Sequence, residues 1–144
     1  MSLLELSIVL AVMGILLSLG LPSLRGFMQQ QRVDRSTDAI LWQITVARSY
    51  AIRTGSPVDL VVDKPGRKLL VQDSTKVWSV MDFSDNGLTV DSLALSLDSG
   101  KLTFSFRGFC LNCPTGGAVL SVYAGGRHRQ IQVGFLGRAE RLAN

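Results

Sequence analysis

The chain has 144 residues, of which 47% are hydrophobic, and it carries a formal net charge of +4 at neutral pH. That length suits about one domain, and the mean hydropathy of +0.28 is high for a soluble protein of this size. With a single histidine, no nucleophile elbow and no phosphate-binding glycine loop, the sequence gives no basis for an enzyme, a bound metal or a cofactor.

The most unusual part of the sequence is its apolar beginning. Leu6–Leu24 hold no Asp, Glu, Lys or Arg, and at roughly 1.5 Å per residue such a helix spans roughly the 30 Å of a membrane's hydrocarbon core. A cleavable signal peptide would have a basic region before a shorter apolar run, whereas no basic residue precedes this one and it continues into further helical sequence. The segment therefore predicts a retained membrane-spanning helix.

Residues 3–53 together predict one long helix with a weak point. Gly14, Gly20 and Pro22 lie in its first half, and a proline has no N–H to donate to the carbonyl four residues earlier. We therefore expect a kink or a melted turn near Gly20–Pro22.

The second half of this helix, residues 27–53, is amphipathic. One face repeats at helical spacing, as expected for packing on the chain's own domain, and consists of Val33, Thr37, Ile40, Leu41, Ile44, Ala47 and Ala51. A second apolar stripe on roughly the opposite side consists of Ala39, Trp42, Val46 and Tyr50. Two interpretations of the second stripe stay open: a helix–helix contact in an assembly, or burial in a thick core.

Beyond the helix, the apolar period changes to two. Gly55 and Pro57 stop the helix, and signals such as Asp98-Ser-Gly and Gly125-Gly then mark turns between short alternating segments. The expected strands are 58–62, 68–72, 77–81, 93–97, 102–106, 118–123 and 131–135.

This element order predicts an α+β fold. A long N-terminal helix, membrane-spanning in its first half and amphipathic in its second, is expected to pack against a C-terminal antiparallel β-sheet domain. The expected division is an assembly and membrane helix over 1–25 and a globular domain over 26–144, the latter with helix 27–53 and a sheet over 57–142.

The N-terminal residues resemble the type IV pilin and pseudopilin signature. Met1-Ser-Leu-Leu-Glu5 opens the apolar helix, and Gly14 and Pro22 follow at matching places. In that family the mature chain begins with an N-methylated residue, usually Phe, followed by a glutamate at the fifth position. Met1 differs from the usual Phe, and the resemblance implies that Met1, Glu5, Gly14 and Pro22 serve assembly.

The rest of the chain resembles minor pseudopilins of the GspH/FimT type. The matching motifs are Ala47-Arg-Ser-Tyr-Ala-Ile-Arg-Thr-Gly-Ser-Pro57, Phe104-Ser-Phe-Arg-Gly108, Pro114-Thr-Gly-Gly and Gly137-Arg138. The resemblance implies a low-abundance, non-enzymatic subunit that initiates or caps a type IV pilus or a type II secretion pseudopilus. It also implies an inner-membrane anchor, a periplasmic C-terminal domain, and partners among other pilins and the inner-membrane assembly platform.

Glu5 is the residue with the sharpest chemical demand. A carboxylate within an apolar membrane helix costs roughly 2.5–3.5 kcal/mol unless a cation meets it. The expected partners are its own N-terminal amine, one turn away, or the amine of a neighbouring subunit. The other interpretation is that Glu5 reaches the lipid headgroups without a specific partner.

Cys110 and Cys113 permit three interpretations: a redox pair, half of a zinc site, or a structural disulfide. Because His128 is the only histidine, the zinc site lacks ligands, and the pair lies between strands rather than at a helix N-terminus. A loop disulfide in the oxidising space outside the inner membrane is favoured. A membrane-tethered thiol oxidoreductase is the remaining enzyme hypothesis.

The last third of the chain is basic, with six Lys or Arg against Glu140 alone in residues 101–144. DNA-binding relatives end in Gly-Arg-x-Arg, whereas here Arg138 and Arg141 are three residues apart and would point to opposite faces of a strand. Arg127 and Arg129 do share a strand face. A DNA-binding minor pilin of the natural-transformation machinery is therefore the alternative function, with these four arginines as the candidate contacts.

Overall fold

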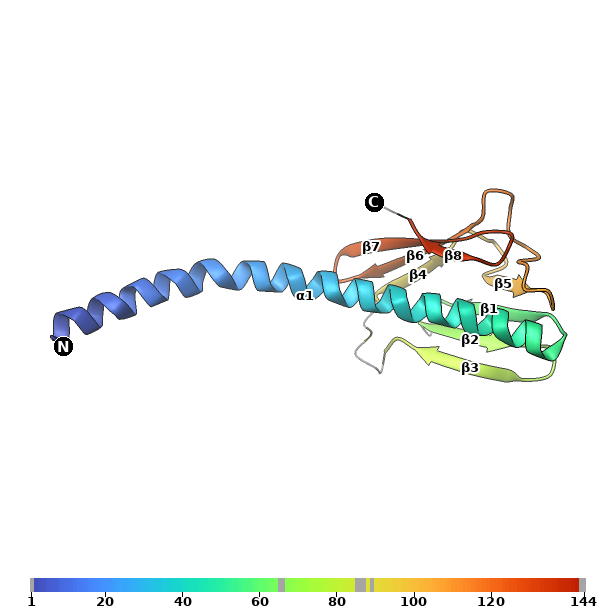
Figure 1. The fold of residues 1–144 in the computed structure, drawn as a ribbon, viewed down its shortest axis with the longest axis horizontal. Helices are drawn as coiled ribbons and strands as arrows, with labels where there is room; N and C mark the ends of the chain where they lie inside the picture. Colours follow the sequence, from blue (N-terminus) through green and yellow to red (C-terminus); the bar gives the residue numbers. More distant parts are fainter. Residues whose placement is uncertain (1, 65–66, 85–87, 89, 143–144) are drawn as a thin grey trace.

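The structure is a computed structural model of the chain. It describes all residues except 1, 65–66, 85–87, 89 and 143–144, and it describes the backbone but not the side chains of residues 17–25. Within these limits, one long helix is followed by short strands that gather around its second half (Figure 1).

The helix, α1, runs over Leu3–Thr54. Its end is fixed by Gly55, which has a φ of 66° and donates its N–H to the carbonyl of Ala51 at 3.1 Å. Such a left-handed turn is easy for glycine and strained for other residues. The chain then leaves the helix axis and begins the first strand.

The melted turn expected near Gly20–Pro22 is not found, because the backbone of α1 stays helical through these residues. A proline removes one hydrogen bond from a helix, and a helix can continue through such a position with a bend. The helix can therefore continue, and Figure 1 shows it curving gently instead of breaking.

The second half of α1 buries the face that the sequence predicts. Six of its seven residues are buried and Leu41 is half-buried; the six are Val33, Thr37, Ile40, Ile44, Ala47 and Ala51. Thr37 fits this face because its hydroxyl donates to the carbonyl of Val33 at 2.7 Å, so no buried polar group is left unsatisfied. The second stripe is only half covered: Tyr50 packs on Trp78, but Trp42 remains 65% exposed.

The strands form two four-stranded sheets in the described part of the chain. They are β1 (Val58–Asp63), β2 (Lys68–Gln72), β3 (Val77–Asp82), β4 (Ser92–Leu95), β5 (Lys101–Phe104), β6 (Ala118–Ala124), β7 (Arg127–Val133) and β8 (Ala139–Arg141). The sheet orders are β3-β2-β1-β5 and β4-β6-β7-β8, and all pairs are antiparallel. The α+β class is thus confirmed, although the strands divide between two sheets instead of one.

The core lies between α1 and the inner faces of both sheets. Alternate residues along the strands are buried, as in β1 with Val58, Leu60 and Val62 and in β6 with Ala118, Leu120 and Val122. Each fully buried Val, Leu, Ile or Phe side chain contributes roughly 1.5–3 kcal/mol relative to exposure. The globular part of the molecule is therefore held by apolar contacts between the helix and the two sheets.

The last two strands differ most from the sequence prediction. β7 begins at Arg127, four residues before the expected strand, and β8 was not expected. The polar run Arg127–Gln130 lacks apolar alternation, but the turn at Gly125–Gly126 places it opposite β6, with Ala124 paired to Arg127. Strand pairing across a hairpin thus outweighs the weak local pattern.

Candidate functional site

The start of α1 is capped by its own residues. The hydroxyl of Ser2 accepts the N–H of Glu5 at 3.3 Å, and the Glu5 carboxylate accepts the N–H of Ser2 at 2.8 Å. This reciprocal arrangement satisfies two N–H groups that a helix start leaves unpaired. Glu5 therefore has a second role, as a helix cap, that the sequence analysis did not anticipate.

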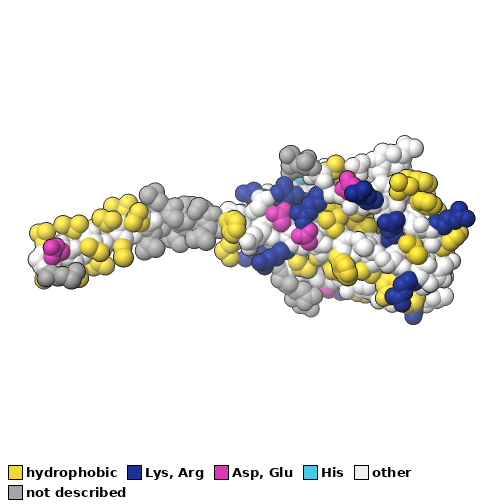
Figure 2. Space-filling model, in the orientation of Figure 1, with side chains coloured by type: hydrophobic (Ala, Val, Ile, Leu, Met, Phe, Trp, Pro, Cys, Tyr) yellow, Lys and Arg dark blue, Asp and Glu magenta, His cyan; other side chains and the backbone are white. Residues whose placement is uncertain are grey.

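The first half of α1 extends away from the β-strands as an apolar rod (Figures 1 and 2). The large apolar side chains that the structure describes in it, up to Leu16, are half to nine-tenths exposed, from Val9 at 50% to Leu3 at 89%. A side chain added at Gly14 would meet no atom within 4 Å, so nothing within the described chain requires a glycine there. Since water is a poor environment for such a surface, this half of the helix calls for cover by lipid or by other chains.

The structure does not fully describe two of the predicted assembly residues. Met1 is outside the described residues, and Pro22 is described by its backbone alone. The predicted span Leu6–Leu24 likewise includes positions whose side chains lie outside it.

A search of the described residues finds no helix with enough length and apolar character to cross a membrane.

Three of the four candidate DNA-binding arginines contact α1. Arg127 donates to the amide oxygen of Gln30 at 2.6 Å, Arg129 lies 3.2 Å from the carboxylate of Asp34, and Arg141 forms an ion pair with Asp38. Gln30, Asp34 and Asp38 are four residues apart, so they stand above one another on the helix. We call this set of contacts the arginine ladder. It ties β7 and β8 to the helix.

Arg138 lies outside the arginine ladder. Its guanidinium is 2.7 Å from Glu140, and both side chains are largely exposed, at 80% and 61%. Two arginines of the ladder face carboxylates, and Arg138 faces a third. Only Arg127 faces a neutral group, so the four do not form a set of uncompensated cations ready for phosphates.

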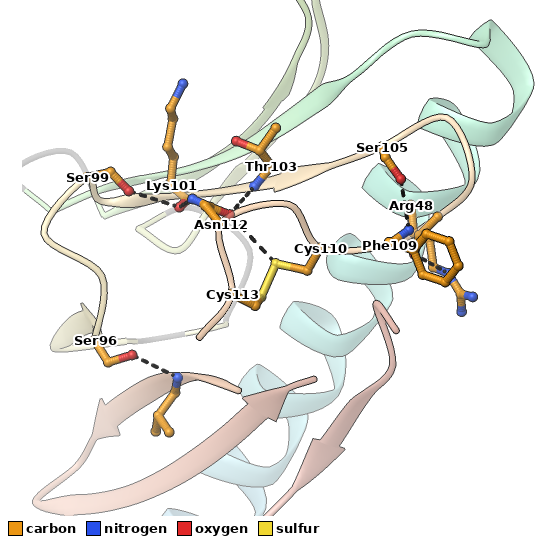
Figure 3. The surroundings of a disulfide bond; sticks show 12 residues. Arg48, Ser96, Ser99, Lys101, Thr103, Ser105, Phe109, Cys110, Asn112 and Cys113 are labelled. Atoms are coloured by element: carbon orange, nitrogen blue, oxygen red, sulfur yellow. Dashed lines mark hydrogen bonds between the residues drawn. A yellow bond between two sulfur atoms is a disulfide. The ribbon is translucent and has the colours of Figure 1, made fainter. Parts of the chain in front are cut away.

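The disulfide predicted for Cys110 and Cys113 is present, with a Cα–Cα distance of 5.5 Å (Figure 3). Between them, Asn112 donates to the carbonyl of Lys101 at 2.8 Å and accepts the N–H of Thr103 at 2.9 Å. The Asn112 side chain thus pairs with β5 as a neighbouring strand would. Cys110 is fully buried and Cys113 is partly buried, which favours a structural bond over an exposed redox pair.

Two loops beside the disulfide are locked together, which the sequence analysis missed. The N–H of Cys110 donates to the carbonyl of Phe135 at 2.8 Å, and Arg48 of α1 donates to the carbonyl of Gly108 at 3.1 Å. A Cβ at Gly137 would collide with that same Gly108 carbonyl, so the close approach requires glycine. The signal was present in the sequence, since Gly108 ends the motif Phe104-Ser-Phe-Arg-Gly108 and Gly137 begins the motif Gly137-Arg138.

Two carboxylates have strongly perturbed pKa values, and both hold turns. Asp73 accepts the hydroxyl and N–H of Thr75, the N–H of Lys76 at 2.9 Å and the indole N–H of Trp78 at 2.8 Å. These bonds, those of Thr75 first, hold the pKa of Asp73 well below its usual range. Ser84, with Lys68 beside it, lowers the pKa of Asp82 to about 2.

Metal-binding chemistry finds no support in the described residues. No group of three or more His, Cys, Asp or Glu among them could hold a metal ion.

In comparisons with known proteins, the matches to this chain are solved structures with a similar fold. No protein-family model matches the chain, and no curated protein matches it. A crystal structure of the type IV minor pilin FimU of Pseudomonas aeruginosa superposes with a TM-score of 0.61 and 16% identity, covering 81% of this chain and 92% of that one. A second crystal form of FimU gives a TM-score of 0.59, 16% identity, and coverage of 76% and 92%.

The minor pseudopilin EpsH of the type 2 secretion system of Vibrio cholerae is similar to the same degree. It gives a TM-score of 0.60 at 15% identity, with 78% of this chain and 97% of that chain covered. Identity this low establishes the shared architecture alone. This chain has the pilin-like α+β fold of minor pilins and minor pseudopilins.

Proposed function

We propose that the chain is a minor pilin or pseudopilin, a non-enzymatic subunit that assembles through the first half of α1. The observation that carries the proposal is the exposed apolar rod at the start of α1, from Leu3 onward, standing clear of the β-strands. The likeness to FimU and EpsH supports it, because both are described as minor subunits of this kind.

The same proposal gives the chain two successive locations. Before assembly, the uncharged segment Leu6–Leu24 anchors it in the inner membrane, with the β-domain in the periplasm. During assembly, the helix exchanges lipid for the helices of other pilins, delivered by the inner-membrane assembly platform. The subunit then lies at the tip or in the initiation complex of a pilus or a secretion pseudopilus.

Glu5 favours the position of the helix among other pilin helices over its position in lipid. Its carboxylate costs roughly 2.5–3.5 kcal/mol in an apolar surrounding, and the Ser2 N–H it accepts carries no charge. A neighbouring subunit's N-terminal amine supplies the missing positive charge in a low-dielectric bundle, where the pair is far stronger than in water. The penalty in lipid thus becomes a driving force for docking.

The test compares Glu5→Gln with Ser2→Ala. Glutamine keeps the capping geometry and removes the charge, whereas Ser2→Ala breaks the cap and keeps the charge. We expect Glu5→Gln and Glu5→Ala to abolish crosslinking to neighbouring pilins and Ser2→Ala to retain it. Membrane fractionation is the control and should show normal insertion of all three variants. Normal crosslinking of both Glu5 variants would contradict the proposed pairing.

A DNA-binding minor pilin of the competence machinery is the second candidate. Arg127 favours it, because its guanidinium contacts the neutral amide of Gln30 and keeps its charge available. The carboxylates beside Arg129, Arg141 and Arg138 weaken it.

A further inference from the structure

Exposed apolar side chains gather on two loops at the end of the molecule opposite the N-terminus. Phe106, Phe109 and Leu111 belong to the loop after β5, and Phe135 and Leu136 to the loop between β7 and β8. We call these five residues the distal patch. Four of them are more than half exposed, Phe106 at 51% and Leu136 at 63% being the extremes. Figure 1 places both loops beyond the strands, near the end of α1, and Figure 2 shows hydrophobic side chains on this part of the surface.

The distal patch is held rigidly. The rings of Phe109 and Phe135 stack with centroids 5.7 Å apart and planes within 10°. Ser105 fixes Phe109 from both sides of the loop, since its N–H donates to the Phe109 carbonyl at 2.8 Å and its hydroxyl accepts the Phe109 N–H at 3.1 Å. Together with the disulfide and the Arg48 contact, these bonds prearrange the apolar side chains. Prearranged groups lose little entropy when a partner binds.

A hollow beside the patch gives a partner side chain somewhere to enter. Its volume is about 300 Å³, and Phe135, Leu136, Arg138 and Glu140 contribute to its lining. Gln132 and Gly134 also line it, so the hollow combines two apolar side chains with three polar ones. Apolar contacts of this kind receive anchor residues in protein interfaces.

The charge around the patch is positive. Residues 105–117 and 134–138, which carry the patch, contain Arg107 and Arg138 and no Asp or Glu, and Arg48 of α1 donates to the Gly108 carbonyl beside them. Arg107 lies over the ring of Phe106, 5.4 Å from its centroid, so it remains beside the apolar surface. Because Arg138 is paired with Glu140, which also lines the hollow, an approaching acidic chain meets Arg107 first and reaches Arg138 only in exchange for Glu140.

We propose that the distal patch is a protein-docking site for an acidic segment that carries an aromatic or aliphatic anchor. The anchor fills the hollow beside Phe135 and Leu136, and flanking carboxylates pair with Arg107 and compete with Glu140 for Arg138. This site is independent of the N-terminal helix, so it stands whether or not the chain assembles through α1.

The test uses the full chain in nanodiscs of uncharged lipid and a fluorescent 14-residue peptide whose Leu-Trp-Leu centre is flanked by four glutamates. The matched peptides replace every glutamate with glutamine or with lysine. We expect the acidic peptide to bind at least about tenfold more tightly than either, and Phe135→Ser with Leu136→Ser to weaken it about tenfold. Arg107→Glu with Arg138→Glu should reverse the preference toward the lysine peptide.

The matched controls lie elsewhere on the surface. Val80→Ser removes an equally exposed apolar side chain on β3, and Arg32→Glu with Arg35→Glu reverses two exposed charges on α1. Both should bind the acidic peptide like the parent, and the melting temperature should show that all variants fold. Failure of the parent to prefer the acidic peptide, or equal losses in the controls, overturns the proposal. So does binding to phosphatidylglycerol vesicles that the patch variants lose, because it makes the surface a lipid contact.

Discussion

Asp73 shows how one side chain can build a turn that sequence signals do not announce. The β2–β3 connection contains no glycine or proline, and the Asp73 carboxylate itself gathers the N–H groups of Thr75 and Lys76. Its bond to the indole of Trp78 fixes the first residues of β3, and Lys76 covers the Trp78 ring at 3.6 Å. A local pattern of this kind is invisible to a search for Gly-rich or Pro-rich turns.

The lowered pKa values of Asp73 and Asp82 predict acid sensitivity. A carboxyl whose folded pKa lies below its unfolded value, about 3.9 for aspartate, contributes stability that is fully present above pH 4. That stability is lost as the pH falls through the folded pKa, about 2 for Asp82 and lower for Asp73. We therefore expect Asp73→Ala to lower the melting temperature at pH 7 and to flatten its decline between pH 4 and pH 2.

Circular-dichroism melts across that pH range check the prediction. Asp98→Asn, in the turn between β4 and β5, is the matched control and should keep the parental profile. An unchanged profile in Asp73→Ala would show that the turn bonds form equally in the unfolded chain.

Among single residues, the sequence predicted the Cys110–Cys113 disulfide, which the structure contains, whereas the assembly role of Glu5 stays a prediction. Glu5 and the cysteine pair stand out because a lone carboxylate in an apolar run and a Cys-x-x-Cys spacing are rare by chance. The capping role of Glu5 with Ser2 was also legible in principle, as a Ser followed three residues later by Glu. Arg48 could not be identified from sequence, because its partner is a backbone carbonyl 60 residues away.

At the scale of elements, the regular spacing of apolar residues decided which helix faces and strands could be predicted. The buried face of α1 was correct because it repeats at 3.6 residues over several turns. Strands β1, β2, β3 and β6 were placed within a residue, and in β1, β2 and β6 buried and less buried residues alternate. β8 was missed because a strand of three residues, two of them charged and exposed, shows no alternation, and only pairing with β7 makes it a strand.

The disulfide yields a prediction for the loop that carries part of the distal patch. The closed loop is short, so its removal should cost at most the typical 2–4 kcal/mol. We expect the variant with Cys110→Ala and Cys113→Ala to fold and to melt at a lower temperature. Its affinity for the acidic peptide at the distal patch should fall although its overall structure is kept. Alkylation of the exported parent without reductant, followed by mass spectrometry, should label neither thiol. Labelling of both would contradict the disulfide in the cell.

At the scale of the whole molecule, the division into two sheets was beyond reach from the sequence. Strand order depends on contacts between distant segments, such as β5 beside β1 and β4 beside β6, and no local pattern encodes them. The arginine ladder belongs to the same class, since its helix partners lie about a hundred residues before its arginines. In the sequence, the basic terminal third suggested a surface for an anionic partner. In the folded molecule, much of that charge is used to bind β7 and β8 to α1.

The arginine ladder leads to a test of DNA binding in which acids are removed as well as bases. Asp34→Asn with Asp38→Asn releases Arg129 and Arg141 from carboxylates. Each guanidinium then free to meet a phosphate steepens the dependence of log affinity on log salt by about 0.9. If this face binds DNA, gel shifts at several salt concentrations should show tighter binding for the double variant and a slope steeper by about two contacts.

Asp63→Asn with Asp98→Asn raises the net charge equally on other elements and should leave the slope unchanged. Arg127→Ala, Arg129→Ala and Arg138→Ala together should remove binding. A triple variant that binds like the parent, or an unaltered slope in the Asp34 and Asp38 variant, would assign these arginines to structure alone and leave assembly as the function of the fold.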